Sequence, residues 1–254
     1  MDITETLDAA KALVDRERLG ARLVTVSGGH LGWSAVVDRE QGLVAGGLPD
    51  EIADPAVADA MVLMDREQSA TLAFGDVEVF VDVLAPRPEL LIFGAVHIAQ
   101  ELSAIARRLG YAVTVSDARP AFTTPERFPE ADRLLVGWPD SLADRLAFDR
   151  RTYVVVLSHD ARFEDPLWPM VLGRPVKYIG AMGSKKTAAR RRQRLLEAGY
   201  AERDVDSIHG PIGLPIGAET PAEVAVAILG EMTAVRYGAG EEFSLIGVVQ
   251  RLGR

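Results

Sequence analysis

The sequence predicts an α/β protein, in which a doubly wound parallel sheet follows a smaller N-terminal α+β domain. Three observations favour this class. From Glu89 onward, short apolar runs alternate with helical patterns in the order of a βαβ fold. The run Tyr153–Leu157 is continuously apolar, which is typical of a central parallel strand covered on both faces. Before residue 86, alternating strand patterns are mixed with helical segments.

The N-terminal domain is expected to span residues 1–85. Its clearest feature is a hairpin over residues 70–85, in which valines at every second position have the period of a half-buried strand. The other expected elements are a helix over 3–18, strands over 22–26 and 34–38, a strand from 42 that runs into a glycine turn at 46–47, and a helix over about 55–67. Pro86-Arg87-Pro88 closes the domain as a stiff linker.

The second domain is expected to span residues 89–238 and to be Rossmann-like. Strands are predicted over 89–93, 112–116, 133–136, 152–157 and 176–180, with helices between them that include 185–198 and 221–236. The last helix has an explicit start signal, because Thr220, Pro221 and Glu223 match a capping box with proline at the first helical position. The C-terminal tail, 239–254, contains one apolar run that the pattern assigns to no element.

The turn after the first strand of the second domain is the strongest indication of a ligand. Gly94-Ala95-Val96-His97 joins that strand directly to a helix, and a glycine turn at a helix N-terminus offers free N–H groups to an anion. Asp117 follows about twenty residues later, where a Rossmann unit carries the carboxylate that meets a ribose. Val96 replaces the middle glycine of a full dinucleotide loop, which weakens ordinary NAD binding. The alternative is the same unit with an empty turn.

Three further segments are expected at the carboxyl edge of the sheet, where open α/β folds bind ligands. They are Ser158-His159-Asp160, the segment around Gly183-Ser184-Lys185, and His209–Glu219. The helix after Gly183 is rich in lysine and arginine, which an anion at Gly183–Ser184 would explain; a solvated basic face paired with acidic neighbours explains it equally well. For a lone histidine such as His97 or His159, packing or capping is favoured over ligand binding.

Composition excludes several classes. The 254 residues contain no cysteine, so disulfides, thiolate metal sites and cysteine nucleophiles are ruled out. A net charge of −9 argues against nucleic-acid binding. No apolar run is long enough to cross a bilayer and the N-terminus has no signal sequence, so a cytoplasmic protein is expected. No Gly-x-Ser-x-Gly elbow, metal-ligand spacing or fixed acid–base pair indicates catalysis.

The second domain resembles the XdhC/CoxI family of accessory proteins for molybdenum hydroxylases. Five segments carry the resemblance in the family's order: 94–99, 115–120 with 125–128, 156–160, 178–185 and 209–221. The resemblance implies an N-terminal XdhC/CoxI domain before the Rossmann domain, binding of molybdenum cofactor, help in its sulfuration, and delivery to a xanthine or carbon monoxide dehydrogenase. It implies this client as a partner and leaves open a cysteine desulfurase and a homodimer.

Two departures from the family's pattern bear on the cofactor. The family's N-terminal domain usually has a cysteine after paired glycines, whereas Gly46-Gly47 is followed by Leu48. The family's usual Gly-x-Gly-His is Gly94-Ala95-Val96-His97 here. Cofactor binding through a thiolate is therefore impossible, and a cysteine-free relative would hold the pterin phosphate by other groups, bind a nucleotide, or bind nothing.

The leading hypothesis is a non-catalytic maturation factor that holds a phosphate-bearing molybdenum cofactor. The alternatives are an NAD(P)-dependent oxidoreductase, with Asp117 or Arg119 at the adenine ribose and a slight preference for NAD(H), and a Rossmann-like protein without a ligand. The candidate cofactor-binding residues are Gly94, Ala95, Val96, His97, Asp117, Arg119, His159, Asp160, Gly183, Ser184, Lys185 and Glu219.

Overall fold

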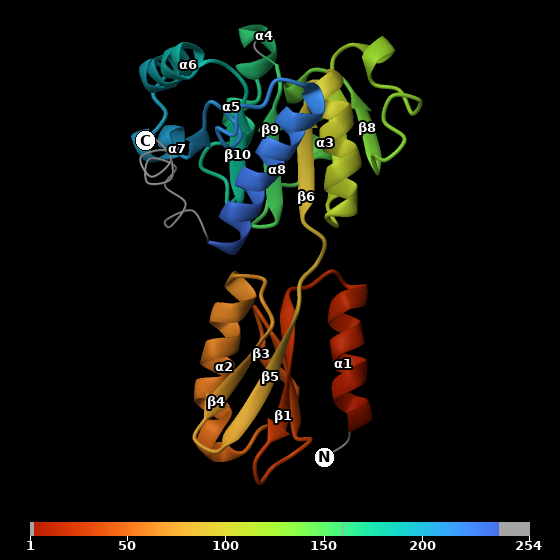
Figure 1. Ribbon diagram of the computed structural model, residues 1–254, viewed down its shortest axis with the longest axis vertical. Helices are drawn as coiled ribbons and strands as arrows, with labels where there is room; N and C mark the ends of the chain where they lie inside the picture. Colours follow the sequence, from red (N-terminus) through yellow and green to blue (C-terminus); the bar gives the residue numbers. More distant parts are fainter. Residues whose placement is uncertain (1–2, 159, 239–254) are drawn as a thin grey trace. The chain divides into compact units, whose positions relative to one another are not determined.

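A computed structural model describes residues 3–158 and 160–238 (Figure 1). The chain divides into two compact units. One extends to Pro86 and includes Arg236–Gly238, and the other is Arg87–Val235. The candidate residue His159 and the predicted tail over 239–254 lie outside the described residues.

The N-terminal unit is a five-stranded antiparallel sheet with one helix on each face. The sheet order is β3-β2-β1-β5-β4, and the elements are α1 (Ile3–Asp15), β1 (Gly20–Ser27), β2 (Ser34–Asp38), β3 (Gly42–Gly46), α2 (Asp50–Asp65), β4 (Ala70–Phe74) and β5 (Val77–Leu84). Val77, Val79 and Val81 are buried against α2, so the alternation in the sequence correctly marks one face of β5. Val36 faces the other way, toward α1.

Helix α2 begins earlier than its sequence pattern predicts. The sequence pattern predicts a helix over about 55–67. The helix instead begins at Asp50, with Glu51 beside it in the first turn, and Pro55 lies inside it. Acidic residues in the first turn are stabilised by the positive end of the helix dipole. Burial of Ile52 in the core also stabilises this turn, and offsets the backbone hydrogen bond that Pro55 cannot donate.

The second unit is a six-stranded parallel sheet in the order β11-β10-β9-β6-β7-β8. Its strands are β6 (Glu89–Phe93), β7 (Ala112–Asp117), β8 (Arg133–Val136), β9 (Thr152–Val156), β10 (Tyr178–Ala181) and β11 (Ile208–His209). The chain runs outward from β6 to β8, then returns to β9 on the other side of β6 and runs outward again. This is the doubly wound Rossmann order, so the predicted fold class is confirmed.

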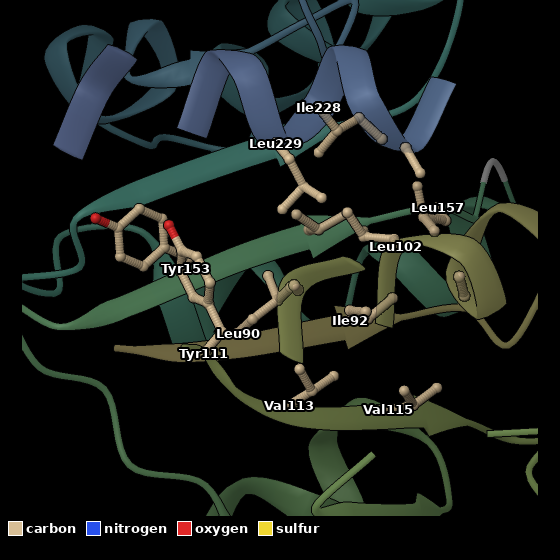
Figure 2. Close-up of a cluster of buried hydrophobic side chains, with 14 of the residues drawn as sticks. Leu90, Ile92, Leu102, Tyr111, Val113, Val115, Tyr153, Leu157, Ile228 and Leu229 are labelled. Atoms are coloured by element: carbon tan, nitrogen blue, oxygen red, sulfur yellow. The ribbon is translucent and has the colours of Figure 1, made fainter. Parts of the chain in front are cut away.

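Helices cover both faces of the parallel sheet. One face carries α3 (His97–Arg108) and α8 (Pro221–Tyr237), and Figure 2 shows Leu102, Ile228 and Leu229 of these helices directed at sheet residues such as Ile92. The other face carries α4 (Ala161–Glu164), α5 (Trp168–Val171), α6 (Lys185–Glu197) and α7 (Glu202–Asp206), with short 3₁₀ turns η1 (Pro120–Phe122) and η2 (Pro139–Arg145) after β7 and β8. The central strands are therefore buried on both sides, as their apolar sequences predict.

The winding direction reverses between β6 and β9. These strands pair in parallel, with Phe93 opposite Val156. After β6 the chain passes to α3 on one face, and after β9 it passes to α4 on the other. Open α/β sheets bind ligands in the crevice at such a reversal. The residues that follow β6 and β9 are therefore the first candidates for a ligand-binding site. No helix in the described ranges is long and apolar enough to cross a bilayer.

Candidate functional site

The turn after β6 requires glycine at position 94. Gly94 has φ +114°, a conformation that side chains rarely adopt, and a Cβ there would lie 3.2 Å from the Ser158 amide nitrogen and 3.3 Å from the Leu157 carbonyl carbon. The turn therefore lies tightly against the loop after β9. Val96 follows as the N-cap of α3 without any side-chain cap, and the Ala99 amide of the first turn donates to the Val96 carbonyl oxygen.

Asp117, at the end of β7, holds this turn in place. Its carboxylate accepts hydrogen bonds from the Ala95 amide at 2.8 Å, the Arg119 amide at 3.0 Å, and Nε and Nη2 of Arg119 at 2.8 and 2.7 Å. A carboxylate has about four acceptor positions, so these bonds occupy its full capacity. Recognition of a ribose by Asp117 stays a prediction, and it would require Arg119 to give way.

The carboxylate of Asp117 is stabilised in its charged form. It is only 3% exposed, and burial raises its pKa. Hydrogen bonds from the Arg119 guanidinium and the Ala95 amide outweigh burial, so the net pKa of Asp117 lies below its ordinary value. The same pairing raises the pKa of Arg119. Asp117 is therefore ionised at neutral pH, where it pairs with Arg119.

A cavity of about 390 Å³ opens beside this turn. Four segments line it, each at the carboxyl end of a different parallel strand. They are Gly94 and Val96 at β6, Asp117, Ala118 and Arg119 at β7, Trp138 at β8, and Leu157, Ser158, Asp160, Arg162 and Phe163 at β9. Its volume suits a small-molecule ligand, and its position is the winding reversal of the sheet. The structure thus brings Gly94, Val96, Asp117, Arg119 and Asp160 together, while Ala95 and the exposed His97 lie beside the cavity without lining it.

Asp160 and Arg162 form an ion pair at the β9 side of the cavity. Asp160 accepts from the Arg162 amide at 3.0 Å and from its Nε and Nη2 at 3.1 and 2.7 Å, and these bonds lower the pKa of Asp160. Trp138 contacts Phe163 with ring centroids 5.9 Å apart, and its indole stays partly exposed to the cavity. Arg162 and Trp138 are not among the candidates drawn from the sequence, because neither belongs to a ligand-binding motif. For Arg162, the one available signal was the tripeptide Asp-Ala-Arg, which occurs at 117–119 and again at 160–162.

The second predicted anion site lies elsewhere. Ser184 caps α6, with its hydroxyl accepting from the Thr187 amide, and Gly183 has φ +142°. Lys185 lines a separate cavity of about 250 Å³ bounded by α6, α7 and the segment after β11, and does not line the one at Gly94. Gly183 and Ser184 line neither of these two cavities, and anion binding by Gly183, Ser184 and Lys185 stays a prediction.

Most of the arginines on α6 pair with acidic neighbours, which agrees with the interpretation of this helix as a basic face paired with acidic residues. Arg191 and Glu164 are both 4% exposed and form a bidentate pair at 3.0 and 2.9 Å. Arg192 pairs with Glu202 and Asp206 at the surface, and Arg194 pairs with Asp165 at 3.0 Å.

The segment over 209–219 is anchored by a carboxylate that the sequence did not identify. Glu231 of α8 accepts from the Tyr178 hydroxyl at 2.5 Å and the Gly213 amide at 2.9 Å, and lies 3.3 Å from Nδ1 of His209. The predicted capping box is confirmed, since Thr220 and Glu223 bond to each other's amides at 3.3 and 2.9 Å. Glu219 is exposed and lines neither of the cavities described above.

In the N-terminal unit, the position after the paired glycines is structural. Gly46 has φ +68°, and a Cβ there would lie against the Ser34 carbonyl oxygen, so only glycine fits. Leu48 is 6% exposed and packs in the core beside α2. Across residues 3–158 and 160–238, no three histidine, aspartate or glutamate side chains are grouped as a metal site would require.

Comparison with known proteins identifies the second unit. A family model described as the XdhC Rossmann domain matches residues 90–232, more than half of the chain. The chain is 32% identical over 158 residues to a Bacillus subtilis protein named as a probable subunit of xanthine dehydrogenase, a match that covers 62% of this chain and 46% of that protein. It is 26% identical over 160 residues to the molybdenum cofactor insertion chaperone PaoD of Escherichia coli, covering 63% of this chain and 44% of PaoD.

One solved structure matches both units in fold. A crystal structure described as a xanthine dehydrogenase from Bacillus halodurans superposes with a TM-score of 0.54 at 15% identity, over 91% of this chain and 95% of that one. This likeness concerns the fold alone. The sequence matches span less than half the length of the curated relatives named above.

Proposed function

The chain belongs to the XdhC Rossmann domain family, and from this we propose that it is an accessory protein for a molybdenum hydroxylase of the xanthine or carbon monoxide dehydrogenase type. It holds a phosphate-bearing molybdenum cofactor during maturation of that enzyme and performs no chemistry of its own. Two relatives support the assignment, one named for xanthine dehydrogenase and the other as a molybdenum cofactor insertion chaperone.

The cavity beside Gly94 is the observation that carries the proposal. It lies at the winding reversal of a Rossmann sheet, next to the N-terminus of a twelve-residue helix, α3, whose dipole favours a negative charge. Arg119 and Arg162 add guanidinium groups on its rim. These are the groups that recognise phosphate, and Trp138 offers an aromatic face on which a pterin ring can stack.

The residues of the cavity fit the phosphate end of such a cofactor, and not a thiolate-bound metal. The chain has no cysteine, and Leu48, which follows the paired glycines of the N-terminal unit, is buried. The bound cofactor supplies the molybdenum centre that the client enzyme requires. This chain's residues orient the phosphate, with Gly94 permitting close approach of the backbone and Asp117 fixing the turn.

Co-expression with a client tests the proposal. A molybdenum hydroxylase encoded near this chain in its genome is produced alone, with the wild-type chain, or with the Gly94→Val variant. We expect the wild-type chain to raise the molybdenum content and activity of the client. We expect Gly94→Val to abolish this gain, because the added side chain would press on the Leu157–Ser158 backbone that borders the cavity.

Gly199→Val is the matched control. Gly199 also has a positive φ, +91°, but a Cβ there meets nothing within 4 Å, so this variant introduces comparable backbone strain away from the cavity. A client that is equally well loaded without the chain, or with a folded Gly94→Val variant, would refute the proposal. A cysteine desulfurase partner and a homodimer stay predictions.

A further inference from the structure

The tripeptide Asp-Ala-Arg occurs twice at the rim of the Gly94 cavity, at 117–119 after β7 and at 160–162 after β9. Both copies have the same geometry. In each, the aspartate accepts from the amide two residues later and from Nε and Nη2 of the arginine, at distances of 2.7 to 3.1 Å. Each copy is a clamp in which a carboxylate fixes the orientation of a guanidinium.

Each clamp leaves donors for a ligand. An arginine side chain has five N–H donors, and its own aspartate engages one on Nε and one on Nη2, which leaves about three. The Arg119 side chain is 55% exposed and the Arg162 side chain 82%. Within residues 3–158 and 160–238, neither Nη1 group has a hydrogen-bond acceptor.

The clamps lie on opposite sides of the glycine turn. The strands β7 and β9 are the two neighbours of β6, so they are separated by about two strand spacings, roughly 10 Å. Because each guanidinium is held by the segment that follows a different strand, the pair suits two linked anionic groups better than one. Each clamp is also electrically neutral, so affinity depends on directed N–H bonds more than on a diffuse positive field.

We propose that Arg119 and Arg162 bind the two phosphates of one diphosphate-bearing ligand across the Gly94 turn. The inference rests on the proposed function, in that it names the chemical class of the ligand that the same cavity holds. Asp117 and Asp160 are positioning residues, which set the plane of each guanidinium without touching the ligand.

Calorimetry with inorganic pyrophosphate and orthophosphate on the full chain tests this assignment. We expect pyrophosphate to bind more tightly than orthophosphate. Arg162→Gln and Arg119→Gln should each weaken pyrophosphate binding by about tenfold or more, the loss typical of a charge-assisted hydrogen bond, and should remove the preference over orthophosphate. Thermal unfolding of each variant verifies that it is folded.

Arg151→Gln is the matched control. Arg151 forms the same kind of pair with Asp149, with Nε and Nη2 at 3.1 and 2.9 Å, but it precedes β9 and does not line the cavity. This variant should leave pyrophosphate affinity unchanged. Equal losses in Arg151→Gln and Arg162→Gln would overturn the proposal in favour of a diffuse field.

Asp160→Asn separates orientation from charge. The substitution makes the cavity rim more positive, so a purely electrostatic site would bind pyrophosphate more tightly. The clamp predicts weaker binding, because Arg162 loses its fixed orientation; tighter or unchanged binding would overturn the proposal. Wild-type protein that loads its client but binds pyrophosphate no more tightly than orthophosphate would refute only the clamp. Wild-type protein that prefers pyrophosphate but has no effect on the client would refute only the proposed function.

Discussion

Asp117 occupies a motif position, and its carboxylate accepts hydrogen bonds from the protein itself. Its spacing from Gly94 is that of a ribose-binding carboxylate. Its side chain is nevertheless occupied by the Ala95 amide and by Arg119, so it joins the ends of two neighbouring strands. Its structural contribution can be measured independently of any ligand.

We expect Asp117→Asn to lower the free energy of unfolding at pH 7 by about 2 kcal/mol, the range for hydrogen bonds to a charged group. The pKa of Asp117 is lowered in the folded protein, so its stabilisation is present above the ordinary aspartate pKa and is lost as the pH falls through the folded value. Urea denaturation from pH 7 down to about pH 3 should therefore show the wild type and variant converging in acid. A difference that stays constant with pH would contradict this role.

The occupied carboxylate also changes the expected cofactor preference. A ribose hydroxyl would have to displace Arg119 from Asp117 before the chain could favour NAD(H), because the carboxylate already accepts hydrogen bonds from Ala95 and Arg119. We expect calorimetric titrations to give NAD and NADP affinities that agree within about threefold, or no binding of either, since threefold is less than 1 kcal/mol. A tenfold preference for NAD would show that Asp117 exchanges Arg119 for a ribose.

At the residue scale, the sequence predicted what is local. Gly94 and its adjoining helix follow from one short segment, because strand, turn and helix are consecutive. Arg162, Trp138 and Glu231 could not be found in this way. Their roles depend on which strand ends and helix faces meet in three dimensions, and their own segments carry no binding motif.

Helix α6 shows that a basic sequence need not be a basic surface. Arg191 is buried in a bidentate pair with Glu164, which links α6 to α4. Removing one partner of a buried pair leaves an uncompensated charge, so we expect Arg191→Ala to destabilise the protein by about 3–5 kcal/mol. Arg192→Ala, which removes only surface pairs on the same helix, should cost about 0–1 kcal/mol.

Denaturant unfolding of the two variants measures this contrast. A cost for Arg191→Ala no larger than that for Arg192→Ala would mean that the buried pair contributes little to the packing of α6.

Helix α8 holds the segment after β11 through Glu231. Burial raises the pKa of Glu231, but hydrogen bonds from His209, Tyr178 and the Gly213 amide outweigh it, and the net pKa lies below its ordinary value. Burial and the nearby carboxylate charge raise the pKa of Tyr178, so its hydroxyl stays a donor.

Glu231→Gln should lower stability by about 1–3 kcal/mol near pH 7, because a neutral amide accepts these bonds more weakly. Because the pKa is lowered in the folded protein, this stabilisation is fully present above the ordinary glutamate pKa and should be lost as the pH falls through the folded value. Thermal unfolding across this pH range provides the measurement. If the variant matched the wild type at pH 7, the segment would be held by its backbone contacts alone.

For the whole molecule, strand positions were predicted well and helix boundaries less well. The strands β6 and β8 begin and end where the sequence patterns do, because buried parallel strands are short apolar runs with sharp limits. The predicted start of α2 near Pro55 was wrong. The helix begins at Asp50, because core packing outweighs the unfavourable effect of a proline inside a helix. Gly94 and Lys185 line two different cavities. This separation depends on how side chains of different elements pack together, which the hydrophobic periodicity of a sequence does not reveal.

The family relation and the switch-point cavity support the same role for the whole chain. The cavity provides arginines, an aromatic face and a helix N-terminus, which suit a phosphorylated heterocycle. The central claim is therefore that the chain carries a phosphate-bearing molybdenum pterin at the Gly94 turn.

Mass spectrometry of small molecules released from the purified protein tests this claim most directly. The wild type, Gly94→Val and Gly199→Val are each purified from molybdenum-replete cells and from cells that cannot make the pterin. We expect a phosphorylated pterin from the wild type and Gly199→Val in replete cells only, and none from Gly94→Val. Wild-type protein from replete cells that releases no pterin, or Gly94→Val that releases as much as the wild type, would contradict the claim.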